Sequence, residues 1–184
     1  MRRFGVRRLI CVIGVICGSI SVVAQAPRIF TNPRPEPYFK QLFRAATAFS
    51  TFGGTPLHYK AYGADPRTTP NAPVVGYIFW TTDVVPKEYG YHGPIHLLVG
   101  MDTKGIITSV VMDYNSEPYG YFSVDPPQFV EQFKNKSIRD PFRVGEDVAA
   151  VSRASITIAS ATRAIRDSAR TMARAFLTPE SVKP

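Results

Sequence analysis

The chain has 184 residues, of which 45% are hydrophobic, and it carries a formal net charge of +8. This length favours one domain with a targeting segment over two domains, and the apolar share is enough for a core. Four of the arginines lie in the first eight residues. Without residues 1–24 the net charge falls to +4, which is too weak a basic balance to indicate nucleic-acid binding.

Residues 1–24 have the pattern of a signal peptide. The cationic stretch 1–8 precedes an apolar run over 9–24, and small residues stand at Ala24 and Ala26, as they do at cleavage sites. We expect cleavage after Ala24 and a periplasmic location. The alternative is an uncleaved membrane anchor, although a run of roughly 16 residues is shorter than the ~20 that a spanning helix needs.

Both cysteines, Cys11 and Cys17, lie in this segment. The mature chain would then contain no thiol, which excludes a disulfide, an iron–sulfur cluster and a haem attached through C-x-x-C-H. A redox role would have to come from a bound cofactor.

The rest of the chain predicts an α+β fold. Residues 25–73 form an N-terminal lead-in, proline-rich at its start, with a short helix over 38–49 and a strand over 57–62. Residues 74–178 form the main domain. Its β-branched and aromatic runs predict strands, and Gly105 supplies a positive φ in the turn between two of them. The predicted strands are 74–82, 95–101 and 106–114, in a small, mostly antiparallel sheet.

Two helices follow the predicted sheet. A short one opens at Asp125-Pro126-Pro127, with Phe129 and Phe133 on its buried side. A long one runs over 152–176 without Gly or Pro. Its expected apolar stripe comprises Ile158, Ala161, Ile165, Ala169 and Met172, and its arginines Arg163, Arg166, Arg170 and Arg174 face mostly outward.

Short motifs follow one another in a fixed order along the domain. They are Gly76-Tyr77-Ile78-Phe79, Thr82-Asp83-Val84-Val85-Pro86, Gly90-Tyr91-x-Gly93-x-Ile95, Leu98-Val99-Gly100-Met101-Asp102-x-x-Gly105-x-Ile107, Glu117-Pro118 and Val151-Ser152-Arg153-Ala154-Ser155. The series resembles the FMN-binding domain family over about 74–175. Within that family it is most similar to the periplasmic domain of nitrous-oxide and nitrite reduction regulators.

The resemblance implies FMN as cofactor. In that family a flavin transferase joins the phosphate of FMN to the threonine of a serine-glycine-alanine-threonine motif. Here the matching residues are Ser152, Arg153, Ala154 and Ser155. Ser155 could form the same phosphoester, but Arg153 replaces the glycine, and Ala149 stands where the family places an aspartate. Covalent attachment therefore stays open at this stage.

The residues themselves also suit a phosphate. The start of a helix offers unpaired N–H groups and the positive end of the helix dipole. Ser152, Arg153, Ser155 and Thr157 lie at such a start, with hydroxyl groups and one guanidinium. The alternative is that Ser152 simply caps the helix.

The resemblance places further residues near the flavin ring. Glu117 would accept from ring N–H groups or repel negative charge on the ring, or it is a solvated loop acid. Gly76, Tyr77 and Tyr91 are candidate cofactor-binding residues, the two tyrosines by stacking. The aromatic residues around Glu117 would cover the ring or form a partner surface; they are Tyr114, Tyr119, Tyr121 and Phe122.

Metal binding is not indicated. His92 and His96 are four residues apart, but Gly93-Pro94 lies between them at a strand start, so the helical spacing of metal-binding pairs does not apply. Motifs of hydrolases, P-loop proteins and nicotinamide-binding folds are absent from the sequence.

We therefore expect an extracytoplasmic FMN-binding electron-transfer protein. Its partners would be redox proteins or a membrane respiratory complex, with a flavin transferase to load it. The alternative is a flavin-poor regulatory or assembly module that keeps the fold. An enzyme with its own substrate finds no support, since no acid–base group or nicotinamide site is evident.

Overall fold

The computed structural model describes residues 35–180. The predicted signal peptide lies outside the described residues, as does the beginning of the lead-in. The helices are α1 (Glu36–Leu42), α2 (Thr81–Val84), α3 (Gly120–Ser123), α4 (Pro127–Glu131) and α5 (Ser155–Phe176); the strands are β1 (Ala48–Phe49), β2 (Tyr59–Tyr62), β3 (Val74–Trp80), β4 (His96–Asp102) and β5 (Ile107–Tyr114).

The five strands form one antiparallel sheet in the order β1-β2-β3-β4-β5, so each strand pairs with its neighbour in sequence. The α+β prediction with a long C-terminal helix is confirmed. The sheet crosses the predicted boundary at 73/74, because β2 in the lead-in pairs with β3. The lead-in thus contributes strands to the same sheet as the main domain.

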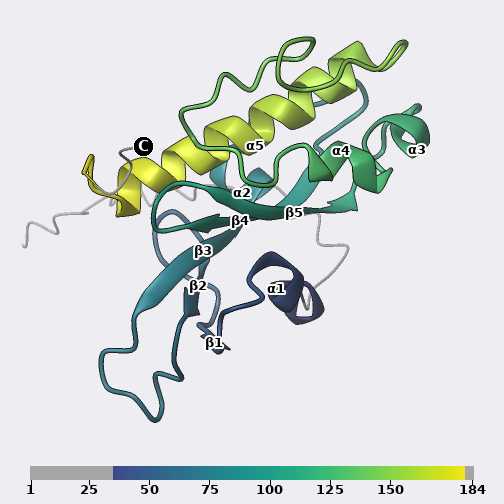
Figure 1. The fold of residues 1–184 in the computed structure, drawn as a ribbon. Helices are drawn as coiled ribbons and strands as arrows, with labels where there is room; N and C mark the ends of the chain where they lie inside the picture. The colour runs from purple at the N-terminus through teal and green to yellow at the C-terminus, as the bar shows by residue number, and fades with distance from the viewer. Residues whose placement is uncertain (1–34, 181–184) are drawn as a thin grey trace, which may run out of the picture.

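Helices cover both faces of the sheet (Figure 1). α5 crosses one face and α1 lies on the other. Alternate residues of β3 point to opposite faces, as a strand requires: Phe79 belongs to the core under α5, whereas Ile78 and Trp80 belong to the core under α1. The core under α5 therefore joins the buried face of this helix to the sheet, and the other core joins α1 to the opposite face.

The turn between β4 and β5 shows why Gly105 is needed. Gly105 has φ +79°, as the sequence predicts. The Asp102 carboxylate accepts from the backbone N–H of Lys104 at 2.8 Å and of Ile106 at 2.9 Å. Because an L-side chain is strained at this φ, the glycine lets the turn close.

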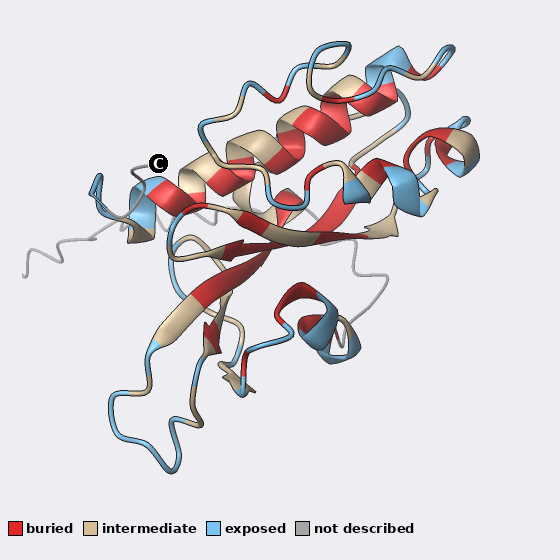
Figure 2. Ribbon diagram, in the orientation of Figure 1, coloured by how far each residue is buried: buried red, intermediate tan, exposed pale blue. Residues whose placement is uncertain are grey.

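α5 is the longest element, with 22 residues, which corresponds to a length of roughly 33 Å. The predicted apolar stripe is fully buried along it, from Ile158 to Met172 (Figure 2). The helix begins at Ser155 and not at Ser152, three residues later than predicted. In the part of the chain that the structure describes, no helix is both long and apolar enough to cross a membrane.

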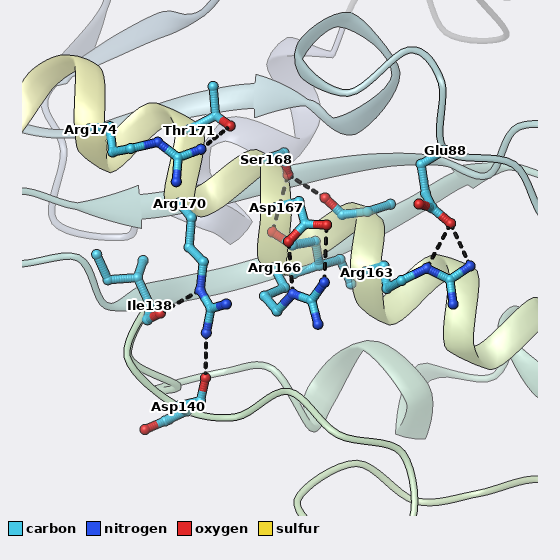
Figure 3. Close-up of polar contacts among 12 residues, drawn as sticks. Glu88, Ile138, Asp140, Arg163, Arg166, Asp167, Ser168, Arg170, Thr171 and Arg174 are labelled. Atoms are coloured by element: carbon cyan, nitrogen blue, oxygen red, sulfur yellow. Dashed lines mark hydrogen bonds and ion pairs between the residues drawn. The ribbon is translucent and has the colours of Figure 1, made fainter.

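The arginines of α5 are held by different partners (Figure 3). Arg163 donates to Glu88 from two nitrogens, at 2.7 and 3.1 Å. Arg170 donates to the backbone carbonyls of Ile138 and Asp140, both at 2.9 Å. These contacts fasten two loops to the outer side of the helix, and sequence spacing did not reveal them.

Candidate functional site

The predicted flavin motif lies just before and within the first turn of α5. Ser152 and Arg153 are exposed, and Ala154 is buried at the N-cap position. No side chain caps this helix. The interpretation of Ser152 as a cap is therefore wrong, because the helix starts at Ser155 and the position before it is an alanine.

Arg153 has a left-handed backbone conformation, with φ +69°. Glycine adopts this region freely, but other L-residues pay roughly 1–2 kcal/mol. The position thus demands the conformation for which a glycine is suited. Arg153 keeps that backbone geometry and adds an exposed guanidinium beside Ser155.

The two hydroxyls at the start of α5 differ in their surroundings. Ser155 is exposed, and among residues 35–180 no hydrogen bond engages its hydroxyl. Thr157 is 3% exposed, and its hydroxyl donates a short hydrogen bond to the Glu117 carboxylate. Of these two hydroxyls, only that of Ser155 is free at the surface.

Glu117 is a buried carboxylate, 8% exposed. Besides the Thr157 hydroxyl, it accepts from the backbone N–H of Tyr91 at 3.0 Å and of His92 at 2.8 Å. Burial alone would raise its pKa, but the hydrogen bonds from Thr157, His92 and Tyr91 outweigh burial and lower it. The interpretation of Glu117 as a solvated loop acid is wrong, since it is buried and bonded.

A cavity of about 280 Å³ opens at this end of α5, close to the ~300 Å³ lower limit typical of ligand pockets. Glu117 is not part of its wall and lies behind it. The expected acceptance of ring N–H groups by Glu117 therefore does not fit the geometry. The wall comprises Tyr91, Pro118, Tyr119, Arg153, Ala154, Ser155, Ile156 and Thr157.

Exposed apolar side chains gather around this cavity. Tyr91 is 67% exposed and Tyr119 46%. In the described part of the chain, the large hydrophobic side chains that are exposed all belong to the loop before β4, to the 117–123 segment or to the first turn of α5; they are Tyr89, Tyr91, Tyr119, Tyr121 and Ile156. An exposed aromatic group of this kind is typical of a binding surface.

Two of the predicted cofactor-binding residues lie elsewhere. Tyr77 is buried at the opposite end of α5, stacked on Phe176 with ring centroids 4.9 Å apart. Gly76 lies under α1, where a Cβ would overlap the Phe43 ring. Neither residue lines the cavity: Gly76 allows close packing, and Tyr77 fills a core position.

His92 and His96, which are four residues apart in the sequence, lie in different environments. His92 is exposed in the loop before β4, whereas His96 is buried, stacked on Trp80 at 4.1 Å and within 2.6 Å of the Thr82 hydroxyl. Between residues 35 and 180, no group of three potential metal ligands occurs.

Sequence reasoning missed two supports of the site. Gly90 touches the Glu117 carboxylate, and a Cβ there would lie 2.5 Å from Oε1. Arg163 holds Glu88, two residues before Gly90, across a separation of 75 residues (Figure 3). The G-Y-x-G motif did draw attention to Gly90. No local sequence pattern indicates an ion pair between residues 75 positions apart, such as Glu88 and Arg163.

The residues present fit FMN. Ser155 offers a free hydroxyl, Arg153 offers a cation for a phosphate, and the aromatic rim offers apolar surface for a flat ring. FMN bound here would be held at its phosphate by the start of α5 and at its ring by the two tyrosine-bearing loops.

Comparison with known proteins agrees with this geometry. No curated protein matches the chain. Residues 90–170 match the model of the FMN-binding domain family, and this range includes the Glu117 loop, the cavity wall and most of α5. Residues 90–170 therefore belong to the FMN-binding domain family, and the cofactor of this domain is FMN.

Proposed function

We propose that the protein is an extracytoplasmic electron carrier whose FMN is attached covalently through its phosphate to Ser155. The observation that supports this most strongly is the difference between the two hydroxyls at the start of α5. Ser155 is exposed at the cavity, whereas Thr157 is buried and bonded to Glu117. Ser155 also occupies the fourth position of the flavin motif.

FMN supplies the redox chemistry when it is bound, and the protein sets its position and its access to partners. The Arg153 guanidinium provides a positive charge for the phosphoester, which retains one negative charge. Tyr91 and Tyr119 provide the apolar surface for the ring. The exposed rim leaves the ring open to a partner protein, as an electron carrier requires.

Attachment is a condensation catalysed by a separate flavin transferase. The Ser155 Oγ forms a bond to the FMN phosphorus of a flavin dinucleotide, the phosphoanhydride bond breaks, and a nucleoside monophosphate leaves while the hydroxyl loses its proton. The protein mass therefore rises by one FMN less one water. The strained Arg153 backbone already has the conformation that this motif needs.

The test is co-expression with a flavin transferase in the periplasm. We expect a yellow colour that survives denaturation and a flavin-bearing peptide that contains Ser155. Ser155→Ala should abolish the adduct without unfolding the protein, because alanine is a good helix former. The matched control, Ser152→Ala, should keep the adduct. Colour that washes out of every variant on denaturation would leave a non-covalent site.

A second candidate function is a regulatory or assembly module without flavin. The exposed tyrosines around the cavity favour it, since they would equally suit a protein partner. Absence of any flavin from wild-type protein purified from its own periplasm, or after loading with FMN, would support this candidate.

The extracytoplasmic location rests on residues 1–24, outside the described residues. We expect periplasmic protein to have a mass that lacks these residues and to contain no thiol. The electron donor and acceptor would then be periplasmic redox proteins or a membrane respiratory complex. Intact-mass data that show Cys11 and Cys17 retained in a membrane fraction would instead indicate an anchored protein.

A further inference from the structure

The Glu117 carboxylate joins three segments that are far apart in the sequence. It accepts from Tyr91 and His92, which are 26 and 25 residues before it, and from Thr157, which is 40 residues after it. Asn115 holds the Glu117 backbone in turn, since its Oδ1 accepts from the Glu117 N–H at 3.0 Å. One buried group thus connects the loop before β4 with the start of α5.

The first consequence concerns Thr157. A threonine hydroxyl has one proton to donate, and in Thr157 that proton is directed to Glu117. Ser155 lies two residues earlier, and side chains two apart on a helix do not share a face. Both residues line the cavity, but the Thr157 hydroxyl is engaged by Glu117, whereas no hydrogen bond within residues 35–180 engages the Ser155 hydroxyl.

The second consequence concerns Tyr91. Its backbone N–H and that of His92 both point to the carboxylate, so the loop is fixed at its middle. Gly90 lies against the same carboxylate with no room for a Cβ. This packing holds the loop backbone against the Glu117 carboxylate, and it thereby positions the exposed Tyr91 ring at the cavity.

We infer that Glu117 is a positioning residue that withholds the Thr157 hydroxyl from flavin attachment and holds Tyr91 at the cavity, so that attachment goes to Ser155 and not to Thr157. This inference rests on the proposed function. It assigns Glu117 no direct contact with FMN, because the carboxylate lies behind the cavity wall and its donors come from the protein itself.

Hydrogen–deuterium exchange of the flavin-free protein tests the loop. In Glu117→Gln one carboxylate oxygen becomes an NH₂ group, which cannot accept from a backbone N–H. We expect amide exchange at Tyr91 and His92 to rise at least tenfold. Gly90→Ala should act in the same direction, because its Cβ displaces the carboxylate without removing charge. The control Glu131→Gln changes an exposed acid of α4 and should leave these amides unchanged.

Peptide mapping after flavin transferase treatment tests the choice of hydroxyl. In wild-type protein we expect FMN on Ser155 alone. In Glu117→Gln and Gly90→Ala we expect at least a tenth of the attached FMN on Thr157, and the double variants with Thr157→Val should lose that fraction. A purely structural role for Glu117 would lower the melting temperature but leave all the FMN on Ser155.

The outcomes separate this inference from the proposed function. Unchanged exchange at Tyr91 and His92 in both variants, or attachment to Ser155 alone in both, would overturn the inference while covalent attachment to Ser155 stands. Wild-type protein that takes no covalent flavin would overturn the proposed function and, with it, the choice between hydroxyls. The exchange data would then still decide whether Glu117 holds the Tyr91 loop.

Discussion

The two ends of α5 use aromatic residues in opposite ways. At its C-terminal end, Phe176 packs on Tyr77 and His58, with ring centroids 4.9 and 4.6 Å apart. At its N-terminal end, Tyr91 and Tyr119 line a cavity and remain exposed. The same helix thus closes a core with aromatic rings at one end and borders an open cavity at the other.

The difference shows what distinguishes a binding aromatic residue from a structural one. Tyr77 lies on a central strand, where its neighbours in β2 and β4 and the end of α5 surround it. Tyr91 lies in a loop whose backbone is held by Glu117, while its ring stays exposed beside that of His92. A fixed backbone with an exposed ring is the arrangement that suits a ligand.

The largest expected effect is that alanine variants of these two tyrosines lose different properties: Tyr77→Ala loses stability, and Tyr91→Ala loses affinity for FMN. Tyr77→Ala should lower the free energy of unfolding by about 3 kcal/mol, because it empties a core position, and should leave the affinity for FMN unchanged. Tyr91→Ala should change stability by less than about 0.5 kcal/mol but weaken FMN binding roughly fivefold, from the loss of about 1 kcal/mol of stacking.

Urea unfolding of both variants measures the loss of stability, and flavin titration measures the loss of affinity for FMN. A Tyr77→Ala protein that folds normally but binds FMN poorly would contradict the division of α5 into a structural end and a binding end.

A smaller effect is expected at Arg153. Arg153→Gly removes the strain of φ +69°, worth about 1–2 kcal/mol, but it adds unfolded-state entropy of about 0.5–1 kcal/mol. We expect a net gain in stability of about 1 kcal/mol together with weaker FMN binding, because the guanidinium is lost. Asn135→Gly, at φ 67° in a loop away from the cavity, is the matched control and should leave FMN binding unchanged.

The smallest expected effect is on the pH dependence of stability, which should differ between groups at the two ends of α5. Burial lowers the pKa of His58 below its usual 6.5, against the opposing bond to the Pro56 carbonyl. His58 therefore contributes stability that is complete above pH 6.5 and decreases as the pH falls below it. Glu117, whose pKa is also lowered, contributes stability that is present above pH 4.5 and is lost only at lower pH.

Unfolding free energies measured between pH 7 and pH 3 check this order. His58→Gln should flatten the curve just below pH 6.5 and leave the steeper acid limb in place, whereas Glu117→Gln should do the reverse. His92→Gln is the control for removing a histidine. Curves of the two variants that differ from wild type over the same pH interval would contradict the assignment.

Much of the fold followed from local patterns, and the site followed only in part. Apolar spacing identified α5 and its buried stripe, and β-branched runs identified β3, β4 and β5, because these signals depend on neighbours in sequence. The start of α5 was misplaced by three residues, since Ser152 has the chemistry of a cap but does not occupy the N-cap position. The order of the motifs identified the family.

Tertiary contacts decided what the sequence could not. Gly76 and Tyr77 were predicted to bind the cofactor, yet they pack against Phe43, just after α1, and Phe176 of α5. The Thr157 hydroxyl bonds to Glu117, 40 residues away. Sequence periodicity does not reveal such pairs. A motif can therefore identify these residues but not their contacts in the folded chain.

The order of the strands has a consequence for when FMN can be attached. Each strand pairs with its neighbour in sequence, and sheets built from near neighbours form early because their loops close at low entropic cost. The cavity, in contrast, needs Tyr91, Tyr119 and Ser155 from three separate segments, and it exists only once α5 has packed on the sheet. A flavin transferase that recognises this cavity would act late, on chains that have completed folding, and attached flavin would then mark the correctly folded population.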